Sequence, residues 1–103
     1  IPLTAFQGKA CHALAGIGNP RRFFDFLERA GLECDTRKFP DHHDYRLDEI
    51  KFNDQSPVLM TEKDAVKCTK IAGTEHWYIP VRAVPDVKFS DRLLKLLREK
   101  ING

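Results

Sequence analysis

An apolar run that stops abruptly at two glycines constrains the fold of this chain more than any other feature. Residues 9–15 (Lys-Ala-Cys-His-Ala-Leu-Ala) are mostly apolar, as in a buried strand, and the segment Gly16-Ile17-Gly18-Asn19-Pro20 follows directly. Its asparagine stands where a helix cap is wanted and its proline at the first helical position, while Gly31 suits the residue just after a helix. We therefore expect a strand over residues 9–15 and a helix over residues 20–30.

The order of strand, then helix, recurs further along the chain. Residues 57–61 form a compact β-type run, and the threonine that ends it can cap a helix extending to about residue 72. Residues 33–39 are a poorer strand because their charged side chains leave little to bury, so we expect them near a sheet edge. Residues 77–81 indicate a further strand, with Pro80 at an edge or a strand end, since proline cannot donate to a ladder.

A final helix is expected from Ser90 or Asp91 onward. Its apolar stripe at helical spacing consists of Leu93, Leu94, Leu97 and Ile101. Strands that alternate with helices predict right-handed crossovers onto a mainly parallel sheet. The fold class expected is therefore α/β, a small single Rossmann-like domain of three layers with helices on both faces of the sheet.

Composition argues against several classes of function. Lys and Arg number 17 against 15 Asp and Glu, so no overall field favours nucleic acid as a partner. The three cysteines are odd in number and form no CxxC pair, which argues against a disulfide framework or structural zinc and favours a reducing cytoplasm. No apolar run approaches the roughly 20 residues needed to cross a bilayer.

The densest polar feature is the segment Phe39-Pro40-Asp41-His42-His43-Asp44-Tyr45. A proline breaks the strand and titratable groups follow in a loop, the place where α/β folds position chemistry. His42 can act as a base near neutral pH, and Asp41 or Asp44 can orient its ring. An equally open interpretation is a polar loop whose aspartates cap a short helix over residues 46–50.

Two functional classes remain open besides an enzyme that uses His42 as a base: a metal-dependent phosphoesterase and, as the third class, a non-catalytic binding module. The triplet Asp41-His42-His43 could ligate a metal, but neighbouring side chains cannot all face one ion, and the only distant histidines are His12 and His76. The same triplet names a family of metal-dependent phosphoesterases, which need further aspartates on separate strand ends that we do not find. The third class is a non-catalytic module that binds a partner or a membrane surface through its last helix.

Two helix N-termini are weaker candidates for contacts to a phosphate group. The turn at Gly16 and Gly18 can present backbone N–H groups to an anion, but it lacks the third glycine of a dinucleotide fingerprint and the lysine of a P-loop, so a structural turn is favoured. Thr61 and Lys63, with Lys67 four residues further on, could meet a phosphate if that helix end faced a cleft. Ordinary capping is the simpler interpretation there.

Taken together, these motifs resemble the C-terminal region of the lipid A 4'-kinases, in the same order and at the same intervals. The segments concerned are His12-Ala13-Leu14-Ala15-Gly16-Ile17-Gly18-Asn19-Pro20 with Arg22-Phe23-Phe24, then Phe39-Pro40-Asp41-His42, Leu59-Met60-Thr61-Glu62-Lys63-Asp64-Ala65-Val66-Lys67-Cys68 and Trp77-Tyr78-Ile79-Pro80-Val81. The resemblance covers nearly the whole chain. It implies that residues 9–103 are a C-terminal α/β domain and that residues 1–8 are a linker from an N-terminal P-loop kinase domain, which this chain lacks.

The resemblance also implies an activity and a place in the cell. The family transfers the γ-phosphate of ATP, with Mg²⁺, to the 4' hydroxyl of a tetraacyldisaccharide 1-phosphate, the lipid A precursor. It does so as a peripheral protein at the cytoplasmic face of the bacterial inner membrane. ATP and Mg²⁺ would be bound mainly by the N-terminal domain, so we expect the isolated chain to be inactive.

The resemblance further implies roles for two residues of this chain. The family uses a catalytic Asp-His pair, in which the aspartate comes from the N-terminal domain and the histidine from the motif that matches Asp41-His42 here. His42 would position or polarise that aspartate so that it takes the proton of the sugar hydroxyl. His43 lies next to the motif and would be an ordinary loop histidine.

Overall fold

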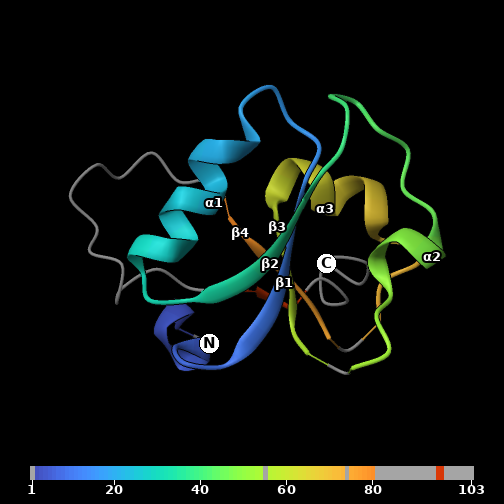
Figure 1. Ribbon diagram of the computed structural model, residues 1–103. Helices are drawn as coiled ribbons and strands as arrows, with labels where there is room; N and C mark the ends of the chain where they lie inside the picture. The colour runs from blue at the N-terminus through green and yellow to red at the C-terminus, as the bar shows by residue number, and fades with distance from the viewer. Residues whose placement is uncertain (1, 55, 74, 81–94, 97–103) are drawn as a thin grey trace.

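A mostly parallel β-sheet runs through the middle of the molecule (Figure 1). The computed structural model describes residues 2–54, 56–73, 75–80 and 95–96 of the 103-residue chain. In that part the strand order is β2-β1-β3-β4-β5. The strands are β1 (Ala10–Ala15), β2 (Glu33–Lys38), β3 (Val58–Thr61), β4 (His76–Ile79) and β5 (Lys95–Leu96), of which the first four are parallel and β5 is antiparallel to β4.

Helices cover both faces of this sheet. A 3₁₀ helix, η1 (Leu3–Phe6), precedes β1, and the α-helices are α1 (Pro20–Arg29), α2 (Leu47–Ile50) and α3 (Glu62–Cys68). From β1 the chain moves through α1 to β2 on one side, and from β3 it moves through α3 to β4 on the other. Crossovers of the same hand in opposite directions place α1 and α3 on opposite faces, as Figure 1 shows. The predicted α/β class is confirmed.

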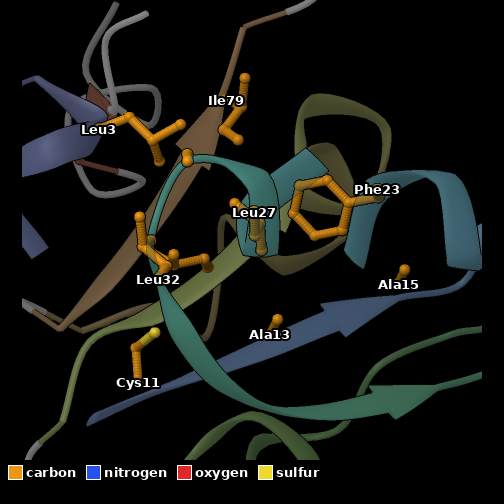
Figure 2. Close-up of a cluster of buried hydrophobic side chains, with 10 residues drawn as sticks. Leu3, Cys11, Ala13, Ala15, Phe23, Leu27, Leu32 and Ile79 are labelled. Atoms are coloured by element: carbon orange, nitrogen blue, oxygen red, sulfur yellow. The ribbon is translucent and has the colours of Figure 1, made fainter. Parts of the chain in front are cut away.

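The first hydrophobic core lies between α1 and the sheet (Figure 2). Its buried members are Leu3, Cys11, Ala13, Ala15, Phe23, Leu27, Ala30, Leu32, Leu59 and Ile79. Alternate residues of β1 supply three of them, because successive strand side chains point to opposite faces. The small alanines of β1 leave room for the aromatic and leucine side chains of α1. Leu3 of η1 is fully buried in the same core.

The second core lies on the opposite face, beneath α2 and α3. Its buried members are Leu14, Tyr45, Ile50, Val58, Met60, Ala65, Cys68 and Tyr78. Tyr45 brings the polar loop that follows β2 into this core, and Ile50 anchors α2 there with no exposed surface. The sheet is therefore buried on both faces in its central strands, as a parallel sheet requires.

Local signals located the first helix well. Asn19 caps α1 by accepting a hydrogen bond from the amide of Arg22 at 3.4 Å, and Gly31 adopts a φ of +89° just after the helix. The helix ends at Arg29, one residue before the expected limit. β2 is a mostly exposed edge strand, as its charges predicted.

Three expected elements need correction. The helix after β3 ends at Cys68 and not near residue 72. β4 begins at His76, one residue before the expected start, and ends at Ile79, so Pro80 directly follows a strand end, one of the two positions expected for it. Residues 95–96 form a short strand where the apolar pattern predicted helix, because Lys95 and Leu96 pair with β4 and that tertiary pairing overrides local propensity. Val81, which was expected in the β4 strand, lies outside the described residues. The rest of the expected final helix also lies outside them.

No helix in the described part of the chain combines the length and the apolarity that crossing a bilayer requires.

Candidate active site at the carboxyl edge of the sheet

Three polar turns meet where β1, β2 and β3 end. These are the glycine turn after β1, the loop of residues 39–45 after β2, and the Thr61 junction between β3 and α3. The strands are parallel and in register, so their carboxyl ends lie at one edge of the sheet. This is the edge at which open α/β sheets bind ligands.

A buried carboxylate, Asp64, joins these turns. Its side chain accepts hydrogen bonds from the backbone amide of Gly16 at 3.1 Å, from the hydroxyl of Tyr45 at 3.0 Å and from the hydroxyl of Thr61 at 2.7 Å. Only 1% of its surface is exposed. A carboxylate without water needs several donors, and Asp64 obtains one from each turn. The sequence indicated only a first-turn acid at this position.

Tyr45 contributes to the same network from the loop. Burial raises the pKa of its phenol above the ordinary value, and the negative charge of Asp64 raises it further. The hydroxyl therefore stays protonated and remains a donor to Asp64. This bond ties the end of the polar loop to the start of α3.

The close approach of these groups explains the glycine at position 16. A Cβ atom there would lie 2.7 Å from the hydroxyl oxygen of Tyr45 and 3.1 Å from the carbonyl oxygen of Pro40. The amide of Gly16 already donates to Asp64. These contacts account for Gly16 without a phosphate ligand.

Replacing Gly16 with alanine is therefore expected to destabilise the protein by about 1–3 kcal/mol, the usual cost of forcing an extra methyl group into a filled site. The matched control is Gly18→Ala, because the nearest atom to a Cβ at Gly18 is 3.9 Å away, on Asp41. We expect the control to lie within about 0.5 kcal/mol of the parent. Urea unfolding of both variants measures the difference, and equal stabilities would contradict the steric explanation.

His42 stands at the tip of the loop and faces solvent. Its side chain is 87% exposed, and its Nε2 atom lies 3.8 Å from Oδ2 of Asp41. Its backbone has a φ of +63°, the single positive value at a non-glycine residue in the described part of the chain. Left-handed backbone is costly for a residue with a Cβ atom and is found preferentially at functional sites. Asp41 lies beside the glycine turn, so the structure brings these predicted residues together.

His43 is held more firmly than the sequence suggested. Its Nε2 atom lies 3.1 and 2.9 Å from the two carboxylate oxygens of Glu49. Its ring stacks on Phe39, with centroids 4.8 Å apart, and meets the edge of Tyr45 at 5.0 Å. The sequence pattern did not single out Glu49 as the partner of His43.

The N-terminus of α2 differs from the expected one. The amide of Arg46 donates to Glu49 at 2.8 Å, so a glutamate inside the helix satisfies this group, and the aspartates of the loop do not cap it. Hydrogen bonding from the Arg46 amide, and then from His43, lowers the pKa of Glu49. The helix begins at Leu47 and not at residue 46. Asp44 is exposed.

The remaining candidates lie on α3 or at its N-terminus. Thr61 caps the helix, as predicted, by accepting a hydrogen bond from the amide of Asp64 at 3.2 Å. Lys63 and Lys67 are exposed on the same helix. Lys63 lies in the first turn of α3, next to the Thr61 junction, whereas Lys67 lies in the last turn.

The two distant histidines have structural partners elsewhere. Nε2 of His76 lies 2.6 Å from the carbonyl oxygen of Ile50, and its Nδ1 accepts a hydrogen bond from Gly73. His12 stacks on Phe52, with ring centroids 3.7 Å apart, and its Nε2 lies 2.7 Å from Asp54. Over the ranges that the structure describes, no group of three or more His, Cys, Asp or Glu side chains is arranged to hold a metal ion.

Asp54 links stability to pH through its contacts. Hydrogen bonds from the Ser56 amide and from His12 lower the pKa of its carboxyl below the ordinary value of 3.8. The stabilisation is complete above that unfolded-state value and is lost as pH falls through the lower folded-state value. Asp54→Asn is therefore expected to weaken the loss of stability between about pH 5 and about pH 2, measured by urea unfolding. An unchanged acid dependence would contradict this assignment.

The fold and the position of the polar turns together define a class of protein. It is a Rossmann-like α/β domain whose polar loops lie at the carboxyl ends of parallel strands. A model of the family described as Tetraacyldisaccharide-1-P 4'-kinase matches residues 2–98, and the chain belongs to this family.

Curated relatives carry the same description. Tetraacyldisaccharide 4'-kinase of Alkalilimnicola ehrlichii is 50% identical over 86 residues, which are 84% of this chain and 26% of the relative. The protein of that name from Nitrosococcus oceani is 43% identical over 98 residues, 95% of this chain and 29% of the relative. The one from Dechloromonas aromatica is 50% identical over 92 residues, 89% and 26% respectively. The chain thus spans little more than a quarter of the length of these relatives. No solved structure matches it.

Proposed function

We propose that this chain is the C-terminal α/β domain of a tetraacyldisaccharide 4'-kinase and that it supplies His42 to an active site shared with a P-loop domain. In this proposal residues 9–103 form the domain and residues 1–8 link it to the P-loop domain. The observation that carries the proposal is the conformation of His42, an exposed imidazole on left-handed backbone at the carboxyl edge. The family match supports the phosphotransferase class and sets aside the phosphoesterase alternative.

The surroundings of His42 support a role toward a group outside this segment. The loop is fixed from below by Tyr45 and Asp64, whereas the imidazole itself is 87% exposed. The loop is already ordered in the folded segment, so little further conformational entropy is lost when a partner group binds the exposed histidine. The Oδ2 atom of Asp41 lies 3.8 Å from Nε2 of His42, close enough to orient the ring while the imidazole stays available to a partner group.

Two observations on the described residues favour a nucleotide and magnesium site that lies mainly outside this segment. The Gly16 amide, which could have faced a phosphate, donates to a buried carboxylate instead. Over the same described residues there is no group of side chains placed to ligate a metal ion. ATP and Mg²⁺ are accordingly proposed to bind mainly in the P-loop domain, with at most peripheral contacts from Lys63.

In the proposed reaction, this chain assists removal of the proton from the sugar hydroxyl and does not contact the transferred phosphate. The 4' hydroxyl of the tetraacyldisaccharide 1-phosphate must lose a proton as it attacks the γ-phosphate in line. An aspartate of the P-loop domain takes that proton, and the imidazole of His42 orients this aspartate by hydrogen bonding and favours its charged form. Asp41 would orient the His42 ring by shortening its present distance of 3.8 Å to a hydrogen bond.

The proposed location follows from the substrate. A tetraacylated disaccharide resides in a membrane, so the kinase would act as a peripheral protein at the cytoplasmic face of the bacterial inner membrane. Vesicle sedimentation of the full-length protein, with and without the lipid substrate, tests this location directly.

The test of the activity is a transfer assay with ATP, Mg²⁺ and tetraacyldisaccharide 1-phosphate. It compares the full-length protein that contains this segment with the segment alone. We expect phosphorylation of the 4' position by the full-length protein and none by the segment. Absence of transfer by the full-length protein would overturn the kinase proposal, and transfer by the segment alone would overturn the shared active site.

A further inference from the structure

We infer that His43 and Glu49 form a positioning pair that holds His42 at the carboxyl edge of the sheet. The inference rests on the proposed function, because it concerns the placement of the histidine that the proposal uses. It assigns a task to two residues that the family resemblance left without one.

The turn that carries His42 is closed by backbone and side-chain contacts. The amide of His43 donates to the carbonyl oxygen of Pro40 at 3.1 Å, which makes a four-residue turn with His42 at its third position. A turn of this kind with left-handed backbone at the third position is of type II, where glycine is usual. A histidine keeps this conformation only if the surrounding structure fixes both ends of the turn.

The first end of the turn is fixed against the glycine turn after β1. The carbonyl oxygen of Pro40 lies 3.1 Å from the place where a Cβ atom of Gly16 would stand. Phe39 precedes it and packs against the second core, and its amide donates to Ala15 at 2.8 Å. Movement of Phe39 would therefore break a hydrogen bond to the last residue of β1, and Pro40 is covalently joined to Phe39.

The second end is fixed by the side chain of His43. Glu49 accepts from both the ring of His43 and the amide of Arg46, so it joins the loop to the first turn of α2. The side chains of His43 and Glu49 are only 23% and 21% exposed, which protects their hydrogen bond from water. Stacking of the His43 ring on Phe39 then connects the second end of the turn to the first.

Loss of this pair is expected to leave the protein folded but to let the turn relax. His42 would then spend less time in its left-handed conformation, so turnover would fall while substrate binding by the rest of the enzyme would not change. We expect Glu49→Ala in the full-length protein to lower kcat roughly 5- to 30-fold, with KM values unchanged. Glu49→Gln keeps an acceptor oxygen and should recover part of the loss.

The matched control is Asp48→Ala. Asp48 is the adjacent carboxylate on α2, is 71% exposed and pairs with Arg46 at 3.2 Å, so its loss removes a similar charge without touching the turn. We expect wild-type kcat for this variant. An equal loss of activity in Asp48→Ala and Glu49→Ala would mean that charge on α2 matters and that the pair does not position His42.

A double-mutant cycle with His42→Ala separates positioning from general loss of structure. If Glu49 acts through His42, its removal has no further effect on kcat once His42 is alanine. If Glu49→Ala merely unfolds part of the protein, the two losses multiply, and the inference is wrong. If His42→Ala is fully active, the proposed function fails instead. If His42→Ala is impaired and Glu49→Ala is fully active, only the positioning role fails.

Discussion

Replacing His42 with alanine in the full-length protein is expected to lower turnover by roughly 10²- to 10⁴-fold, the contribution typical of a group that assists proton transfer. Stability should change little, because the side chain is 87% exposed and loses few contacts. The measurement is kcat for transfer of the γ-phosphate to the tetraacyldisaccharide, with urea unfolding of the same variant.

A second variant, His42→Asn, separates the imidazole from the backbone. Asparagine tolerates left-handed conformations better than alanine, so it suits the φ of +63° while removing the imidazole. Similar losses in both variants would assign the effect to the imidazole. A rate near that of the parent for either variant would remove His42 from the mechanism.

Replacing Asp64 with alanine is expected to cost about 3–5 kcal/mol of folding free energy. The change leaves three donors without their acceptor: the amide of Gly16 and the hydroxyl of Tyr45, which are buried, and the hydroxyl of Thr61, which is partly buried. Because small domains are stable by only about 5–15 kcal/mol, much of the protein should unfold in moderate urea.

Two comparisons make the Asp64 prediction specific. Asp64→Asn keeps one acceptor oxygen and should cost less than Asp64→Ala. Lys67→Ala removes an exposed side chain from the same helix and should lie within about 0.5 kcal/mol of the parent. A cost below about 1 kcal/mol for Asp64→Ala would show that water replaces the carboxylate at the junction.

The sequence predicted those parts of the fold whose causes are local. Asn19 and Gly31 lie at the ends of one helix, and each acts on the backbone within a few residues, so α1 was located to within one residue. The charges of β2 identified an edge strand because an interior strand could not bury them.

The parts that were missed depend on contacts between distant residues. Asp64 lies 48 residues from Gly16 in the sequence, and nothing near either one reveals their hydrogen bond. Local propensity likewise favoured helix at residues 95–96, which instead pair with β4. His43 looked like an ordinary loop histidine because its partner, Glu49, belongs to a four-residue helix that the loop pattern only weakly indicated.

The two cores on opposite faces of the sheet imply different tolerance to mutation. The second core contains Tyr45 and Ile50, and Phe39 packs against it. This core therefore supports both the fold and the loop of His42. The first core packs α1 against the sheet and contains no residue of that loop among its described members. Conservative exchanges beneath α1 should therefore be selected for stability alone. Substitutions beneath α2 and α3 should be selected for stability and activity together. The second core should therefore accept fewer substitutions than the first core as the sequence diverges.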